Sequence, residues 1–417
     1  MIKIKNIHKD ISWLFINQLM GYLIPLILFP FLGRKLGPSG FGLIMFSQSF
    51  ALVLAFFIEY GFYVSAQRDT ANININNKKS LQFIVSSVNS AKLILSLFFT
   101  VIFFVIALFT NKFNHNYPLI LLVLALGNVL GFSLTWFFRA TGNLILASTL
   151  DILTKFFALI FCLLFIQGPG DEWKFLLSLF ISQLVFLGYS FFYLQSKLIL
   201  DVLSFADGLD RLKKGYKMFC SHFLGAFLTL GNPFLLGLFL PIHDVGLFSA
   251  AEKISRVSVS FLEPLKISLF PRFASLVARS PQKAQFFIHS AAMKFIFIGL
   301  TLSLGLFFLS DLLINIIFGA KYSESVSILK IISFFPFFYA LDSAYTFLWI
   351  LPRHKESSTI HILFMGNILN FLSLFLFAEI FGPKIMAWNM LFTQCLIGIS
   401  FFIIAKRDML SLTKEFR

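Results

Sequence analysis

The chain has 417 residues, of which 58% are hydrophobic and only 13% are charged, and its formal net charge is +15. A soluble protein carries about 25% charged residues, so this composition excludes an ordinary soluble protein and indicates a membrane protein. The apolar stretches are continuous rather than alternating, which excludes a membrane β-barrel.

Twelve apolar stretches follow one another along the chain, and each is long enough to cross a bilayer as a helix. They lie at 12–32, 43–65, 84–109, 118–138, 144–166, 175–195, 217–240, 246–270, 288–312, 326–350, 356–381 and 385–405. The sequence therefore predicts an all-α polytopic membrane protein with about twelve transmembrane helices.

Lysine and arginine in the loops predict how these spans are oriented, because cytoplasmic loops carry an excess of basic residues. With the N-terminus in the cytoplasm, 21 lysines and arginines fall in cytoplasmic segments and six on the far side. Both termini are therefore expected in the cytoplasm. The same bias accounts for most of the net charge, and the basic loops lack the interleaved aromatic residues that would indicate a nucleic-acid partner.

The stretch LGRKLGPSGFG at 32–42 separates the first two spans and contains four glycines. Glycine permits tight turns, so we expect the chain to reverse sharply there. Pro25 and Pro30 in the preceding span are expected to bend it. A weaker copy of the stretch, at 240–249, follows a span that contains Pro233. These three prolines are therefore candidate hinges.

A faint internal repeat relates the two halves of the chain. The segment at 41–50 aligns with 245–254, and each opens the second span of its half. The longest loop, 196–217, lies between them. We therefore predict two pseudo-symmetric six-helix bundles, 1–200 and 201–417, around a central cavity, as in many secondary transporters. The alternative is a chance similarity between two turns rich in glycine and proline.

The eighth span, 246–270, is the least apolar of the twelve and carries Glu252, Lys253, Arg256 and Glu263. Exposing charges to lipid costs about 2.5–3.5 kcal/mol each, so this helix is expected to face protein or a water-filled cavity. Arg256 lies near mid-depth and could hold a phosphate through two hydrogen bonds, with Lys253 beside it. Alternatively, Glu252 and Arg256 neutralise each other, because they are four residues apart.

The fifth span contains Asp151 and Lys155, also four residues apart. Their spacing favours an internal ion pair, which can still line a cavity. Asn17 in the first span and Asn232 in the seventh are candidates for hydrogen bonds to a sugar or to the backbone.

Three further basic residues lie nearer the cytoplasmic ends of their spans, namely Arg139, Lys92 and Lys294. Long basic side chains in such positions reach the interface, and this accounts for all three. Arg139 is also a candidate substrate contact.

Four acidic residues are candidates for ion coupling, and they are Glu59, Asp151, Glu252 and Asp342. A buried carboxylate can exchange a proton during a transport cycle. Alternatively, each pairs with a cation from another helix. The sequence contains no catalytic, nucleotide-binding or metal-binding motif, so we expect no enzymatic activity, no cofactor and no metal.

The stretch NQLMGYLIPLILFPFLGRKLGPSGFG at 17–42, with FFIEYGFYVSAQRDTA at 56–71, resembles the N-terminal signature of the Wzx-type polysaccharide flippases. These belong to the multidrug/oligosaccharidyl-lipid/polysaccharide exporter superfamily. The resemblance is strongest over 12–75, and elsewhere it extends only to helix count and length.

The resemblance implies an activity and a set of partners. The chain would transfer an undecaprenyl-diphosphate-linked oligosaccharide, such as an O-antigen unit of lipopolysaccharide, between leaflets of the bacterial inner membrane. Transfer would run from the cytoplasmic to the periplasmic leaflet by alternating access. Membrane lipids, a polysaccharide polymerase and a chain-length regulator are the further partners implied.

Two alternatives stay open at this stage. A multidrug antiporter of the same superfamily would share the architecture, and the spans hold as many basic residues as acidic ones, so charge does not separate the two. A polysaccharide polymerase or ligase has a similar number of spans, but it carries a large periplasmic loop that this sequence lacks.

Overall fold

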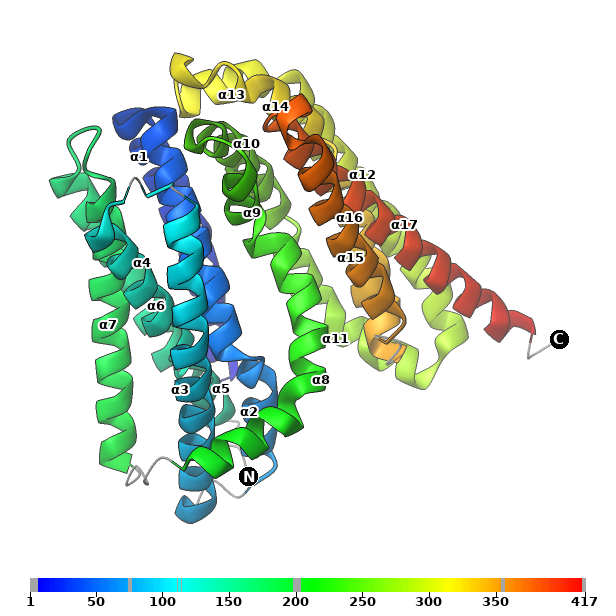
Figure 1. Ribbon diagram of the computed structural model, residues 1–417. Coiled ribbons are helices and arrows are strands. Elements are labelled where there is room, and N and C mark those ends of the chain that lie inside the picture. Colours follow the sequence, from blue (N-terminus) through cyan, green and yellow to red (C-terminus); the bar gives the residue numbers. More distant parts are fainter. Residues whose placement is uncertain are drawn as a thin grey trace. The chain divides into compact units, whose positions relative to one another are not determined.

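The computed structural model describes residues 7–73, 77–110, 112–113, 115–197, 204–353 and 357–414 (Figure 1). All regular structure in these ranges is helical, which confirms the prediction of an all-α polytopic fold. Nine helical segments of the described residues are long and apolar enough to cross a membrane. The first of them, Leu23–Ala71, contains part of the first predicted span and all of the second. None of the nine covers 217–240 or 246–270.

The chain divides into two compact units, Met1–Phe234 and Leu235–Arg417. The proposed division into six-helix halves at residue 200 stays a prediction. The first unit contains α1 (Ile7–Glu59), α2 (Phe62–Ala71), α3 (Lys78–Phe109), α4 (Tyr117–Gly131), α5 (Thr135–Ala140), α6 (Leu144–Phe165), α7 (Glu172–Lys197) and α8 (Phe205–Leu230). Helix α9 (Asn232–Phe239) contains the boundary between the units.

The second unit continues with helices of more varied length. They are α10 (Ile242–Ser260), α11 (Glu263–Arg279), α12 (Pro281–Phe308), α13 (Ser310–Ile317), η1 (Ala320–Tyr322), α14 (Ser325–Ile332), α15 (Phe335–Tyr345), η2 (Thr346–Ile350), η3 (Leu351–Arg353), α16 (Ser357–Phe381) and α17 (Lys384–Lys414). The eighth predicted span is therefore divided between α10 and α11.

The prediction of a tight reversal at 32–42 is confirmed. Two helical stretches of α1 meet here at Gly37, which departs from helical dihedrals with φ 70° and ψ 179°. The rings of Phe29 and Phe41, on either side of Gly37, lie with their centres 6.3 Å apart, whereas twelve residues of one continuous helix would separate them by about 18 Å. The φ of Gly37 lies in the left-handed region, which glycine adopts without steric cost. Pro38 follows at the first turn of the next helical stretch, where its missing N–H would have no partner in any case. The chain therefore reverses at a single residue between the two helical stretches of α1.

The three candidate hinge prolines lie in two different settings. Pro25 and Pro30 are inside α1 and keep helical dihedrals, whereas Pro233 lies in the first turn of α9, just after α8 ends at Leu230. A helical proline removes one intrahelical hydrogen bond, so a bend at Pro25 or Pro30 remains a prediction.

In the first unit, α1 packs closely against α4 through glycines of α4. A Cβ atom on Gly127 would lie 2.8 Å from Leu54 Cδ2, and one on Gly131 would lie 2.7 Å from Ile58 Cβ. A side chain at either glycine would therefore push the two helices apart. This packing holds the end of α1 against the break between α4 and α5.

In the second unit, α15 leads into the π-helix η2, whose turn contains an extra residue. The indole Nε1 of Trp349 in η2 donates to Asp408 Oδ2 of α17 over 3.0 Å. The Nε atom of Arg353 lies 2.7 Å from the same carboxylate oxygen. The π-helix is thus anchored to α17 through a buried acid.

Candidate functional site

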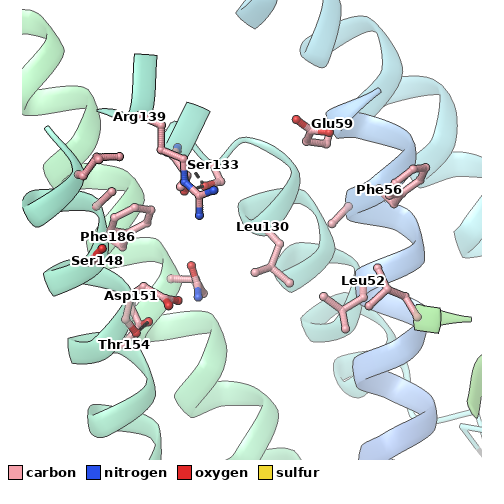
Figure 2. A pocket seen from close by; sticks show the side chains of 16 residues that line it. Leu52, Phe56, Glu59, Leu130, Ser133, Arg139, Ser148, Asp151, Thr154 and Phe186 are labelled. Carbon is pink, nitrogen blue, oxygen red and sulfur yellow. Dashed lines mark hydrogen bonds between the residues drawn. The ribbon is translucent and has the colours of Figure 1, made fainter. Parts of the chain in front are cut away.

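Helices α1, α4, α5, α6 and α7 of the first unit line a pocket of about 380 Å³ (Figure 2). Three predicted site residues, Glu59, Arg139 and Asp151, line it together. Figure 2 shows Glu59 on one side of the pocket and Asp151 on the other. The remaining polar lining comes from Ser133, Thr135, Ser148, Thr154 and Gln183. The pocket therefore combines charged groups of both signs with hydroxyl and amide groups.

Glu59 is held in place by the start of the next helix. Helix α1 ends at Glu59, and Tyr60 and Gly61 then adopt left-handed dihedrals, with φ 51° and 75°. Helix α2 begins directly afterwards, and its first N–H groups need acceptors. The Glu59 carboxylate accepts from the N–H of Gly61 over 3.0 Å and also from the N–H of Tyr63. The predicted coupling residue is thus also a helix cap.

Arg139 lies in the last turn of α5 and is positioned by Tyr63 of α2. Its Nη1 donates to the Tyr63 hydroxyl, and its guanidinium carbon lies 4.9 Å from the centre of that ring. No carboxylate of the described residues lies within 4.0 Å of Arg139. The guanidinium therefore keeps donors for an anion in the pocket.

Asp151 and Lys155 form the ion pair that their spacing predicts. Lys155 Nζ lies 2.8 Å from Asp151 Oδ2, and the two side chains are 37% and 42% exposed. A Cβ atom on Gly21 would lie 3.6 Å from the same ammonium, so Lys155 also reaches the first part of α1. Asp151 lines the pocket and Lys155 does not, so the pair contributes its carboxylate to the wall and keeps the compensating ammonium beside it.

Lys92 of α3 belongs to this region, although the sequence analysis assigns it to the membrane interface and not to a site. Its side chain is completely buried, and Nζ donates to the carbonyl of Ser133 over 3.0 Å. Ser133 lies in the non-helical break between α4 and α5, where carbonyls lack intrahelical partners. The ammonium also attracts the carboxylate of Glu59. Our expectation that Lys92 reaches the interface is therefore wrong, whereas the exposed Lys294 is consistent with it.

The charged residues of α10 lie in the second unit, and two of them are paired. Arg256 donates from Nε over 3.0 Å and from Nη2 over 2.8 Å to the same oxygen, Glu252 Oε1. Glu252 is only 2% exposed. The i,i+4 pairing considered from the sequence therefore forms, and Lys253 lies half-buried beside it. Nothing in this pairing tests a substrate or coupling role.

Asp342 lies in α15, within a second polar cluster. It accepts from Thr346 Oγ1 over 2.8 Å and from Gln394 Nε2 over 3.3 Å. Nearby on the same helix, Tyr339 donates to Glu263 over 2.5 Å, and the buried Lys266 lies 2.8 Å from Glu263. The Glu263–Lys266 spacing is visible in the sequence, but the contribution of Tyr339, 76 residues away from Glu263, is not.

Of the two asparagines predicted as hydrogen-bonding residues, only Asn232 has a described side chain. Asn232 is 1% exposed and begins α9. Asn17 belongs to α1, but its side chain lies outside the described residues.

Comparison with known proteins places this geometry in context. Residues 7–277 match the family model described as "Polysaccharide biosynthesis protein". A protein of Escherichia coli (strain K12) named "Putative O-antigen transporter" is 24% identical over 405 residues, which are 94% of this chain and 95% of that protein. A protein of Shigella dysenteriae with the same name is 24% identical over 395 residues, 93% of this chain and 97% of its own length.

Two solved structures share the fold. An inward-facing multidrug resistance MATE family transporter of the MOP superfamily superposes with a TM-score of 0.68 at 14% identity, covering 97% of this chain and 99% of its own. The lipid II flippase MurJ, in an inward closed conformation, gives the same TM-score and identity over 95% of this chain and 87% of its own. The fold alone does not separate these activities, but the matched family model spans well over half of the sequence. The chain therefore belongs to the polysaccharide biosynthesis protein family.

Proposed function

We propose that this chain is a flippase that moves an undecaprenyl-diphosphate-linked oligosaccharide, such as an O-antigen unit, from the cytoplasmic to the periplasmic leaflet. It would act without enzymatic chemistry in the bacterial inner membrane, with both termini in the cytoplasm. The family match and the two curated relatives named as O-antigen transporters support this proposal. A multidrug antiporter is the competing activity, because a multidrug transporter has an equally similar fold.

The observation that carries the proposal is the polar pocket beside Arg139. A lipid-linked glycan presents an anionic diphosphate and many sugar hydroxyls. The guanidinium of Arg139 suits a phosphate because its planar donors bind two oxygens at once. Ser148, Thr154 and Gln183 supply hydroxyl and amide groups for the sugar. Within a low-dielectric unit these contacts would replace the water that the head group leaves behind.

The other predicted residues complete the proposal. Arg256, Lys253, Lys155, Asn17 and Asn232 would contact substrate at other stages of the cycle. The acidic residues Glu59, Asp151, Glu252 and Asp342 would exchange a proton or another cation. Alternating access would move two six-helix halves, 1–200 and 201–417, about the hinge prolines Pro25, Pro30 and Pro233. A polysaccharide polymerase and a chain-length regulator would use the product.

A leaflet-protection assay tests the proposal directly. The full chain is reconstituted into sealed vesicles that carry labelled undecaprenyl-diphosphate oligosaccharide in both leaflets. A membrane-impermeant glycosidase added outside cleaves only the outer-leaflet glycan in protein-free vesicles. With the protein present, we expect the protected inner pool to be cleaved as well. Vesicles with an unrelated polytopic protein control for leakage, and an enclosed soluble dye reports whether they remain sealed.

The outcome separates the two activities. Continued protection of the inner pool by well-folded protein, with the cognate glycan, contradicts the flippase. Extrusion of a cationic dye under an ion gradient in the same vesicles would then support the multidrug antiporter.

A further inference from the structure

Helices α11 and α12 of the second unit form a hairpin, and a groove of about 550 Å³ lies between them. Its walls are mainly apolar, formed by Leu265, Leu269, Phe273, Leu276, Phe287, Ala291, Phe295 and Ile298. The hairpin turn is short, because Ser280 alone separates the two helices. The groove therefore follows a single supersecondary element of one unit.

Three basic side chains line this groove, and they are Arg272, Arg279 and Lys294. No acidic residue lines it. Across the described part of the chain, no carboxylate lies within 4.0 Å of any of the three basic groups. All three side chains are exposed. The groove thus joins a concentrated positive charge to an extended apolar surface.

The surroundings of the groove indicate contact with lipid. Helix α12 is one of the segments long and apolar enough to cross a membrane. Around the groove it exposes large apolar side chains, including Phe286 at 78%, Phe287 at 54% and Phe297 at 71%. Lys294 lies about 20 Å along the helix from Pro281, so its Cα is well within this segment. Its ammonium is unfavourable in hydrocarbon unless it reaches a polar group toward the interface, such as the phosphate of a lipid.

We propose that this groove binds an anionic glycerophospholipid of the surrounding bilayer. The phosphate group lies beside Arg272, which is about 10 Å along α11 from Arg279 and so lies between the levels of Arg279 and Lys294. Arg279 and Lys294 attract the phosphate from either side, and an acyl chain follows the apolar wall past Phe295 and Ile298. Basic grooves between membrane helices bind anionic head groups in this way. The lining contains only Ser275 and Ser290 as neutral hydrogen-bonding groups. A glycan needs more such partners, so the groove suits a phospholipid better than the lipid-linked oligosaccharide.

Lipid binding to the full purified chain tests this proposal. Native mass spectrometry in detergent would compare phosphatidylglycerol with phosphatidylcholine of the same acyl chains. We expect the first phosphatidylglycerol molecule to bind with a dissociation constant at least about tenfold lower than that of phosphatidylcholine. Each basic group near the phosphate adds to the attraction. The variant R272Q/R279Q/K294Q should lose this preference.

The matched control removes three basic groups of the same unit that do not line the groove, in K283Q/K406Q/R407Q. It should keep the preference. If both variants lose the preference for phosphatidylglycerol equally, the preference reflects the general charge of the chain and the proposed site is wrong. Equal binding of the two lipids by the wild type would also overturn the site. Stronger binding of undecaprenyl diphosphate than of phosphatidylglycerol at the groove would overturn the choice of ligand.

A second measurement uses only the wild-type chain, so it does not depend on how the variant folds. Photoactivatable phosphatidylglycerol is crosslinked in vesicles, and the labelled peptides are identified. Labelling concentrated within residues 265–298 supports the proposal. Labelling spread evenly over the membrane helices, without enrichment in that hairpin, contradicts it.

Discussion

The ammonium of Lys92 donates a hydrogen bond to the backbone carbonyl of Ser133 over 3.0 Å, and so joins α3 to the break between α4 and α5. Lys92 is completely buried, and Ser133 lines the polar pocket. A buried charge therefore fixes the backbone of one pocket wall. Glu59, which faces the same pocket, is attracted by this ammonium. Among the described residues the two groups form no ion pair within 4.0 Å, so they stabilise each other at longer range.

Replacing Lys92 by methionine should destabilise the first unit by about 3 kcal/mol or more. The Ser133 carbonyl would lose its donor, and Glu59 would lose a compensating charge. Chemical unfolding in detergent, followed by tryptophan fluorescence, measures the change. The double variant K92M/E59Q should recover part of the loss, because glutamine keeps an oxygen to cap α2. A K92M variant as stable as the wild type would contradict this structural role of Lys92.

Replacing Arg139 by glutamine should slow glycan flipping by about tenfold or more, because a hydrogen bond to a charged group contributes about 1.5–3 kcal/mol. The leaflet-protection assay measures the initial rate. R68Q is the matched control, since Arg68 belongs to the same unit, is 67% exposed and does not line the pocket. Equal rates for R139Q and the wild type would remove Arg139 from the substrate site.

Changing Lys155 to methionine should also slow flipping, because it leaves the Asp151 carboxylate uncompensated on the wall of a pocket that binds an anion. The double variant D151N/K155M removes both charges and should flip faster than K155M. This order of rates, measured in the same assay, distinguishes an electrostatic role from a direct contact. If the double variant is the slower one, Asp151 itself takes part in transport.

Changing Arg256 to glutamine should lower stability, because Glu252 is almost fully buried and would lose two charged hydrogen bonds. Breaking a buried pair in this way costs about 3–5 kcal/mol. The double variant E252Q/R256Q should regain most of that stability in thermal unfolding. If flipping is lost in the stable double variant, the pair has a transport role; if flipping persists, the pair is structural.

Changing Gly299 to alanine should destabilise the packing of α12 against α15 by about 1–3 kcal/mol. The new Cβ would lie 2.5 Å from Ala340 Cβ and 2.9 Å from the Pro336 carbonyl oxygen, and neither atom can move easily. Gly305 provides the control on the same helix, because no atom lies within 4 Å of its added Cβ. G305A should be neutral or stabilising by about 0.5–1 kcal/mol. Comparable unfolding midpoints for the two variants would refute the packing argument.

Local spacing explains most of what the sequence predicts correctly. The apolar stretches give the helices, and the four-residue separations give the Asp151–Lys155 and Glu252–Arg256 pairs. Such pairs depend only on helical geometry, so no knowledge of the tertiary fold is needed. The sequence assigns Glu59, Arg139 and Asp151 separately as site residues, and it is the structure that brings them into one pocket; their roles stay predictions.

Contacts between distant segments explain what the sequence does not predict. Tyr63 reaches Arg139 across 76 residues, and Lys92 reaches Ser133 across 41. Neither contact has a local signature, and a lysine near a span end looks the same whether it turns inward or outward. The reversal at 32–42 has a local signature, and the sequence predicts it correctly. Its four glycines do not show which residue makes the turn, and within α1 it is Gly37 that uses a conformation other residues avoid.

The π-helix between Thr346 and Ile350 holds one residue more than an α-helical turn would need. Removing one residue from this turn would restore α-helical spacing and leave the helical stretches on either side in nearly the same phase. Removing one residue from α15 would instead rotate the two sides of the gap by about 100° relative to each other. The contact of Arg353 with Asp408 and the packing of α15 would then no longer be satisfied together. A single-residue deletion is therefore expected to be tolerated better within 346–350 than within Phe335–Tyr345.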